Sequence, residues 1–147
     1  KLGVLHGCVF TEKCEACAKE FFRDHDLGGI SFQPTGRHCD ACGGKLLDTV
    51  LDWDDGLPDS EWVPATRHFE DADLAIALGT SLRIVPAGEL PLTSKAFVIV
   101  NLQPTPYDGS ATLVIRAKVD VVMAALLEAL GLDLPPPPPP RDAATEV

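Results

Sequence analysis

The chain has 147 residues, 46% hydrophobic and 23% charged, the balance of a globular protein with room for one domain, or one domain and a small satellite. No apolar run approaches the roughly 20 residues of a membrane-spanning helix, so we expect no membrane partner. The formal net charge of −10 repels nucleic-acid phosphates, which argues against strong direct nucleic-acid binding. A lysine-rich peptide would instead be attracted.

Four of the five cysteines form two CxxC pairs, Cys14 with Cys17 and Cys39 with Cys42, and residues 12–47 around them show no sustained helical or strand period. Two residues between cysteines let one tight turn direct both sulfurs at a point about 2.3 Å from a zinc ion. We therefore predict a module held folded by one structural Zn²⁺, with no coordination position left for a catalytic water. A redox-active CxxC is the alternative, but two pairs at this separation favour metal in a reducing compartment.

Residues 48–134 alternate short apolar runs with helix-like stretches. The segment 60–72 predicts a helix in which Pro64 lies in the first turn or causes a kink. Proline interrupts the segment 85–95, which predicts a short or broken helix. Continuously apolar runs predict three strands of a parallel sheet covered on both faces, at 73–78, 97–100 and 112–115.

The segment 119–131 predicts a closing helix that ends at Gly131. Its apolar side chains fall on one stripe: Val119, Val122, Met123, Leu126 and Leu130. The order of elements predicts an α/β fold, part of a doubly wound parallel sheet with a small four-cysteine zinc-binding module. The remaining "PPPPPPRDAATEV" (135–147) predicts a proline-rich disordered tail.

Small or polar residues follow the first two predicted strands, where ligands bind to open parallel sheets. Glycine permits close approach of a ligand, hydroxyls donate to phosphate, and amides recognise ribose. From spacing alone, a turn that caps the next helix and an ordinary loop remain open alternatives, because neither phosphate-loop fingerprint is present here. The residues are Gly79, Thr80 and Ser81 after the first strand, and Asn101, Leu102 and Gln103 after the second.

The acidic segment "TVLDWDDGLP" (49–58) carries one large aromatic residue, Trp53. A tryptophan among aspartates either covers a ligand or belongs to an acidic turn in which one residue folds back onto the core. The pattern does not decide between these two readings.

Together these segments resemble the sirtuins, in particular the sirtuin-6-like nuclear branch, over nearly everything before the proline tail. The matching motifs are "LHG" (5–7), the two CxxC pairs with "TGRHC" (35–39), "LLDTVLDWDDGLPD" (46–59), "ADLAIALGTSLRIVPAGELPL" (72–92), "VIVNLQPTPYD" (98–108) and "VDVVM" (119–123). The resemblance implies a partial Rossmann-like NAD-binding catalytic domain formed by residues 1–11 and 48–134, with the zinc-binding module at 12–47. It also implies NAD-dependent removal of acyl groups from protein lysines, which yields nicotinamide and O-acyl-ADP-ribose.

By the same resemblance, His6 is the general base that takes a proton from a ribose hydroxyl, a task suited to histidine near neutral pH. The segment Leu51, Asp52 and Trp53 would pair with the substrate peptide and line the acyl-lysine channel. The implied partners are acylated lysines of histone tails in chromatin, in the nucleus. In the cofactor site, Gly79, Thr80 and Ser81 would contact the dinucleotide, Asn101 and Gln103 the adenosine ribose, and Leu102 and Val119 the adenine.

The chain departs from the family pattern in two respects. Cys8 stands where sirtuins usually have asparagine, and the glycine-rich NAD loop and arginine-bearing cofactor loop that precede LHG in sirtuins are not among these residues. We therefore expect the C-terminal portion of a deacylase, inactive by itself. A non-catalytic zinc-bearing interaction module, or mono-ADP-ribosyl transfer as the main activity, is the alternative.

Overall fold

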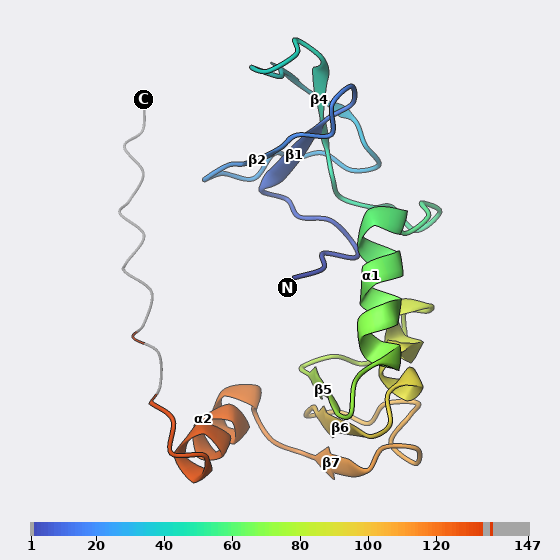
Figure 1. The fold of residues 1–147 in the computed structure, drawn as a ribbon, viewed down its shortest axis with the longest axis vertical. Coiled ribbons are helices and arrows are strands. Elements are labelled where there is room, and N and C mark those ends of the chain that lie inside the picture. Colours follow the sequence, from blue (N-terminus) through green and yellow to red (C-terminus); the bar gives the residue numbers. More distant parts are fainter. Residues whose placement is uncertain (1, 134–135, 137–147) are drawn as a thin grey trace. The chain divides into compact units, whose positions relative to one another are not determined.

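The computed structural model describes residues 2–133 and 136 and groups the chain into two compact units, 1–71 and 72–147. Each unit contains a sheet of its own (Figure 1). No helix in the described part is both long and apolar enough to cross a bilayer. The predicted tail, apart from Pro136, lies outside the described residues, and the predicted grouping of 1–11 with 48–134 as one domain stays a prediction.

The first unit contains a four-stranded antiparallel sheet in the order β2-β1-β4-β3. These strands form in a part of the chain whose sequence shows no sustained strand period. The strands have only three to five residues, and buried positions on β1 and β4 include the carboxylates Glu12 and Asp48, so no apolar alternation marks them. The strands are β1 (Thr11–Cys14), β2 (Glu20–Phe22), β3 (Pro34–His38) and β4 (Lys45–Asp48).

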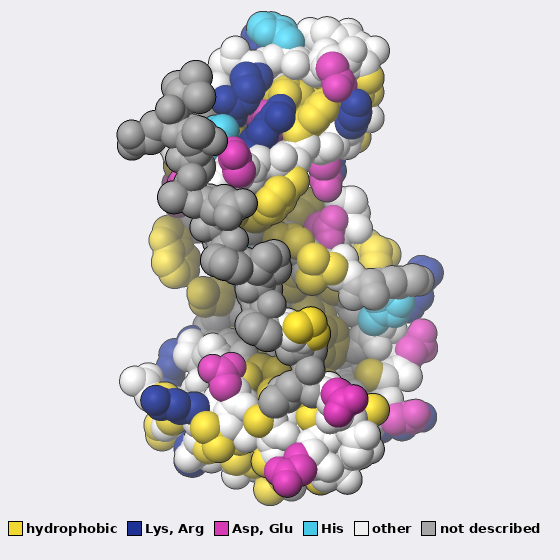
Figure 2. All heavy atoms as spheres, turned by 90° about the vertical axis from the view of Figure 1, so that its left-hand side faces the viewer, with side chains coloured by type: hydrophobic (Ala, Val, Ile, Leu, Met, Phe, Trp, Pro, Cys, Tyr) yellow, Lys and Arg dark blue, Asp and Glu magenta, His cyan; other side chains and the backbone are white. Residues whose placement is uncertain are grey.

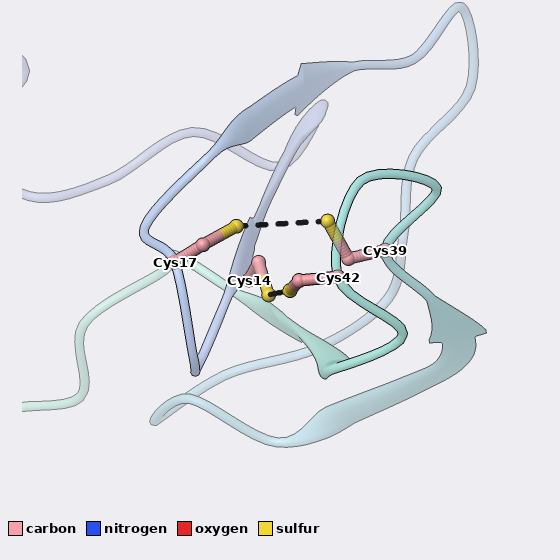
Figure 3. A group of neighbouring side chains, drawn as sticks. All are labelled: Cys14, Cys17, Cys39 and Cys42. Atoms are coloured by element: carbon pink, nitrogen blue, oxygen red, sulfur yellow. Dashed lines mark hydrogen bonds between the residues drawn. The ribbon is translucent and has the colours of Figure 1, made fainter.

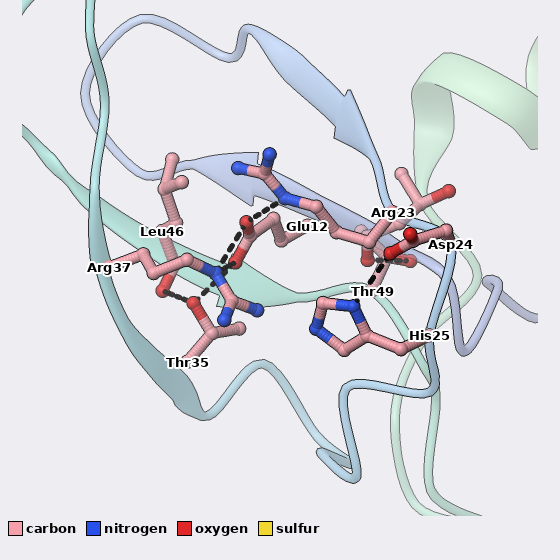
Figure 4. Close-up of polar contacts among 9 residues, drawn as sticks. Glu12, Arg23, Asp24, His25, Thr35, Arg37, Leu46 and Thr49 are labelled. Carbon is pink, nitrogen blue, oxygen red and sulfur yellow. Dashed lines mark hydrogen bonds and ion pairs between the residues drawn. The ribbon is translucent and has the colours of Figure 1, made fainter. Parts of the chain in front are cut away.

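Glu12 is fully buried and is satisfied by two arginines and a hydroxyl (Figure 4). The Nε atoms of Arg23 and Arg37 donate to its carboxylate at 2.6 and 2.9 Å, and the hydroxyl of Thr35 donates as well. Burial raises the pKa of Glu12, but the hydrogen bonds from Arg37, Thr35 and Arg23 outweigh it and hold the pKa below its usual value. The carboxylate thus ties β1 to β3 and to the chain after β2.

Asp48, at the end of β4, is the second buried carboxylate. It accepts the backbone N–H of Gln33 at 2.6 Å and that of Val50 at 2.9 Å. Gly29 lies directly against this carboxylate, since a Cβ there would come within 2.6 Å of it. Asp48 therefore fixes the loop before β3 to the segment that leaves β4.

Helix α1 (Asp59–Glu70) closes the first unit. Pro64 is its sixth residue, so it lies beyond the first turn, and the helix continues through it. The proline ring has no N–H to donate, which removes one hydrogen bond from the helix. The prediction of the helix is confirmed, while the placement of Pro64 in the first turn is wrong.

The second unit contains the predicted parallel sheet, in the order β5-β6-β7. A 3₁₀ helix, η1 (Ala87–Thr93), connects its first two strands and holds Pro91, as expected for a short or broken helix. The strands are β5 (Ala75–Leu78), β6 (Phe97–Val100) and β7 (Leu113–Ile115).

Coverage of this sheet differs from the prediction. The central strand β6 buries Ile99 and Val100, which face opposite sides of the sheet. On β5 alternate residues are exposed, with Ile76 at 43% and Leu78 at 39%. Hydrophobic side chains are accordingly visible on the surface of the second unit (Figure 2). An apolar run therefore predicted burial on both faces correctly for the central strand β6 but not for the edge strand β5.

Helix α2 (Val119–Ala129) ends as predicted at Gly131, which has a φ of +65°. The N–H of Gly131 donates to the carbonyl of Glu128, and that of Leu132 donates to the carbonyl of Leu127. This pair of bonds is the Schellman motif, which satisfies the last carbonyls of a helix and requires a left-handed residue.

We predict that Glu12→Gln lowers the free energy of unfolding of the first unit by about 2 kcal/mol, because the two arginines lose their charged partner. Both tryptophans, Trp53 and Trp62, belong to this unit, so their fluorescence in a denaturant titration reports on it alone. The matched control is Glu20→Gln, which removes only the exposed pair with Lys13 and should cost less than about 0.5 kcal/mol. Equal losses for the two variants would contradict the buried role of Glu12.

Candidate functional site

The four predicted metal ligands converge in the first unit. Their sulfur atoms all lie within 4.8 Å of one another, with Cys14 and Cys42 3.4 Å apart and Cys17 and Cys39 3.7 Å apart (Figure 3). A tetrahedral zinc–thiolate site with bonds of about 2.3 Å has sulfur–sulfur separations of about 3.8 Å. The donor set and the spacing of the sulfurs therefore fit one zinc ion.

The two CxxC turns have the same backbone hydrogen bonds. The N–H of Ala18 donates to the carbonyl of Cys14 at 3.0 Å, and the N–H of Gly43 donates to that of Cys39 at 2.9 Å. Ala18 and Gly43 both have positive φ, 60° and 76°. Gly44 completes the second turn, because a Cβ there would lie 2.8 Å from the sulfur of Cys14. Each pair is thus held by a local turn that aims both sulfurs at the same point.

The pKa values of Cys14 and Cys42 are shifted in opposite directions. A hydrogen bond from the backbone of Cys17 lowers the pKa of Cys14 to about 7. The backbone of Gly44 lowers the pKa of Cys42, but the neighbouring thiols outweigh it and raise the value to about 12. The metal-free cluster therefore keeps protons that a zinc ion has to displace, so zinc affinity falls as the pH falls.

Histidine is absent from this cluster. Among the described residues, the group that could hold a metal consists of the four cysteines alone. His38, which precedes Cys39, is exposed, and His6 is exposed in a turn before β1. The separation of His6 from the metal ligands, inferred from the sequence, agrees with this geometry.

The turn that carries His6 lies against the segment after β4. The carbonyl of His6 accepts the N–H of Leu51 at 3.3 Å. Gly7 has a φ of +79°, and a Cβ there would overlap the backbone of Thr49. Glycine is therefore required at this position, and the structure brings His6 next to the start of the predicted substrate segment, Leu51, Asp52 and Trp53.

Asp55 organises this predicted substrate segment. Its carboxylate accepts the N–H of Asp52 at 2.8 Å and the hydroxyl of Ser31 at 3.0 Å. Trp53 is 86% exposed, so the alternative in which it folds back onto the core is wrong. The acidic turn therefore presents an indole ring at the surface.

A small pocket lies beside the His6 turn, within the first unit. Its volume is about 130 Å³, and Gly7, Cys8 and Thr49 are among its lining residues. Cys8 is half-buried, and its N–H and carbonyl both bond to the hydroxyl of Thr49 at 3.2 Å. The sequence singled out Cys8 as a departure from the family but did not indicate this pocket.

The second unit brings the predicted cofactor residues together at the carboxyl ends of its strands. The N–H of Gly79 donates to the carbonyl of Val100 at 2.9 Å, and the N–H of Asn101 donates to that of Ile115 at 3.2 Å. Gly79 has a φ of +60°, and a Cβ there would lie 3.5 Å from Val119. The residues after β5, those after β6 and the first residue of α2 are therefore neighbours.

Two local turns shape this edge. The hydroxyl of Thr80 accepts the N–H of Leu82 at 3.2 Å, so it closes a turn and does not cap η1, which begins later. The side chain of Asn101 donates to the carbonyl of Gln103 at 2.9 Å. Leu102, between them, is 64% exposed and open to a ligand. Ser81 is also exposed.

Arg116, directly after β7, is a residue of this edge that the sequence analysis missed. Its guanidinium group donates to the carbonyls of Asn101 and Gln103 and pairs with Asp108. The available signal was an arginine at the end of a predicted strand, the position at which the other two predicted strands carry ligand-type residues.

We predict that Cys39→Ser reduces bound zinc from one ion per chain to well below one and destabilises β1–β4, because a hydroxyl is a poor replacement for a thiolate ligand. Zinc content is measured by atomic emission after dialysis, and folding by tryptophan fluorescence. His38→Ala, one residue away and exposed, should keep its zinc. Full zinc content in Cys39→Ser would contradict the four-thiolate site.

Comparisons with known proteins agree with this geometry. The sequence model of the Sir2 family matches residues 1–86. The NAD-dependent protein deacetylase SRT1 of Arabidopsis thaliana is 47% identical over 92% of this chain, and the NAD-dependent protein deacetylase Sirt6 of Drosophila melanogaster is 38% identical over 91%. The chain spans 30% and 46% of the length of these two relatives.

Solved structures give the same result. A structure described as Sir2 bound to acetylated peptide superposes on 90% of this chain with a TM-score of 0.69 and 30% identity, and the match covers 57% of that protein. A complex of Sir2 with a p53 peptide and NAD⁺ gives a TM-score of 0.66 and 29% identity over 89% of this chain, with 56% of that protein covered. On its sequence, its sheet and its four-cysteine cluster, the chain belongs to the Sir2 family.

Proposed function

We propose that this chain forms part of an NAD-dependent protein-lysine deacylase, with His6 as the general base. The observation that carries the proposal is the position of His6: its ring is exposed, it stands apart from the metal cluster, and its turn is bonded to the start of the segment Leu51–Trp53. Relatives that match about nine-tenths of the chain are named NAD-dependent protein deacetylases, which supports the same activity.

Zinc has a structural role in this proposal. The four cysteines would hold the ion, and all four positions of a tetrahedral zinc are then filled by sulfur. No position remains for water or substrate. The ion supplies folding free energy to a module whose buried apolar cluster is limited to Cys14, Cys39 and Leu46, with Phe21 packed against it.

NAD, when bound, supplies the ADP-ribosyl group to which the acyl group is transferred and nicotinamide as the leaving group. His6 accepts a proton from a ribose hydroxyl of that group, and Gly79, Thr80 and Ser81 contact the dinucleotide. Glycine at the first of these positions leaves the sheet edge open to close approach, and the serine hydroxyl is exposed. Asn101 and Gln103 bind the adenosine ribose, with Leu102 and Val119 beside the adenine.

The proposed substrate is an acylated lysine in a basic protein segment, such as a histone tail in the nucleus. Leu51, Asp52 and Trp53 would contact the peptide, and the exposed indole of Trp53 offers an apolar surface for the lysine stem or the acyl group. The net charge of −10 attracts lysine-rich peptides. Sir2 structures have been solved with an acetylated peptide and with a p53 peptide, which supports a peptide substrate.

In the deacylase of which this chain is proposed to form part, we expect His6→Ala to reduce deacylation of an acetylated peptide by at least about a hundredfold. A general base contributes that much to the rate. Formation of nicotinamide and O-acetyl-ADP-ribose is followed by chromatography. His68→Ala, an exposed histidine on α1, is the matched control and should retain activity. Unchanged zinc content and fluorescence would show that His6→Ala is folded; near-normal turnover by that folded variant would exclude His6 as the base.

Assayed by itself, the 147-residue chain is expected to give no turnover with NAD and an acetylated peptide. The reason is that the glycine-rich NAD loop and the arginine-bearing cofactor loop, which the resemblance to sirtuins implies for the cofactor site, are not among these residues. The same chromatographic assay measures this, with a complete Sir2 deacetylase as positive control. Turnover by the chain comparable to that of the control would refute the expectation.

A further inference from the structure

One guanidinium group joins three parts of the loop that follows β6. Because Val100 pairs with Ile115 in the parallel sheet, the next residues, Asn101 and Arg116, leave the sheet side by side. One terminal nitrogen of Arg116 donates to the carbonyl of Gln103 at 2.7 Å and to that of Asn101 at 3.3 Å. The other terminal nitrogen pairs with the carboxylate of Asp108.

Asp108 anchors the far end of the same loop. Its other oxygen accepts the hydroxyl of Thr105 at 2.8 Å and the N–H of Thr105 at 3.1 Å, and Thr105 is buried. The hydrogen bonds from Thr105, followed by the charge of Arg116, hold the pKa of Asp108 below its usual value, so the ion pair persists at neutral pH. Arg116 is thus held by a partner that the loop itself keeps in place.

The carbonyl of Gln103 connects Arg116 to the side chain of Asn101. This oxygen accepts both the guanidinium of Arg116 and the side-chain amide of Asn101, at 2.7 and 2.9 Å. A carbonyl has two lone pairs, so both bonds can form together. The orientation of the Asn101 amide therefore depends on a carbonyl whose position Arg116 fixes.

We propose that Arg116 is a positioning residue for the adenosine side of the nucleotide site. It holds Asn101 and Gln103 in the geometry that receives the ribose, without contacting the nucleotide itself. The inference rests on the proposed function, because it takes the edge after β6 to be the adenosine site. It assigns a role to the end of β7, the third strand of the sheet, where the sequence analysis named no site residue.

The planar fork of arginine is essential to this role. The guanidinium reaches two carbonyls with one nitrogen and a carboxylate with the other, whereas the ammonium of lysine is a single point charge on a flexible stem. Arg116→Lys keeps the charge and the pairing with Asp108 but cannot hold both carbonyls in the same plane. The lysine variant therefore separates positioning from charge.

The test is titration of the zinc-loaded chain with adenosine, which needs no pyrophosphate site, followed by calorimetry. Arg116→Ala and Arg116→Lys are each expected to bind about tenfold more weakly than the unsubstituted chain, the effect of losing one charge-assisted hydrogen-bond set. The control is Lys95→Ala, which removes an exposed pair with Asp73 in the same unit and should bind adenosine normally.

A second measurement distinguishes positioning from general stability. In the ligand-free chain, NMR should show the side-chain amide resonances of Asn101 shifted in both arginine variants, while hydrogen exchange of the β5 and β6 amides is unchanged. If Arg116→Ala loses the protection of these amides from exchange, the comparison is made with Arg116→Lys and Asp108→Asn, which keep most of the packing. Binding by these two variants then decides whether Arg116 has a positioning role.

The outcomes separate the two proposals. If the unsubstituted chain does not bind adenosine, the proposed adenosine site is wrong and the role of Arg116 falls with it. If the unsubstituted chain binds and the folded Arg116 variants bind within twofold of it, the positioning role is wrong and the proposed function stands. Weaker binding by the folded Arg116 variants, together with a shifted Asn101 amide resonance, supports both proposals.

Discussion

The convergence of four sulfur atoms on one point is the constraint on which the first unit depends. The buried apolar cluster of its sheet consists of Cys14, Cys39 and Leu46, so two of its three members are themselves predicted metal ligands. Burial of so few side chains contributes only a few kcal/mol, whereas zinc contributes about 10–16 kcal/mol to modules of this kind. The strands are therefore positioned by the two CxxC turns, and each turn is closed by the same local hydrogen bonds, from Ala18 and from Gly43. A zinc ion held by these cysteines would take the place of a hydrophobic core.

A module without a large core can accommodate charge inside it. Glu12 and Asp48 occupy positions where a larger domain would place valine or leucine, and each is satisfied by several donors. Leaving either carboxylate without its donors would cost several kcal/mol, so these residues specify which loops and strands meet. The same feature hides the strands from sequence analysis. An alternating pattern is recognised from apolar residues on the inner face, and on β1 and β4 carboxylates occupy part of that face.

The parts that could be predicted from sequence are those set by short-range chemistry. The CxxC spacing predicted that four cysteines would converge, the run "FVIV" matches β6 residue for residue, and Gly131 ends α2 as predicted. What could not be predicted depends on partners far along the chain. Arg116 reaches Asn101 and Gln103 only because β6 and β7 are parallel and in a particular register. The exposure of Ile76 and Leu78 depends on β5 lying at an edge of the sheet, which an apolar run alone does not reveal.

Gly7 in the first unit and Gly79 in the second are constrained in different ways. At Gly79 a Cβ would make ordinary contact with Val119 at 3.5 Å, so the constraint there is the positive φ of the backbone. At Gly7 a Cβ would overlap the backbone of Thr49, so glycine is required by packing as well as by conformation. The residue after His6 must therefore be glycine for the turn to lie against the segment after β4. The LHG motif thus has a structural reason apart from its proposed chemistry. Its glycine lets the histidine lie beside the segment proposed to hold the substrate, and any larger residue would push that segment away.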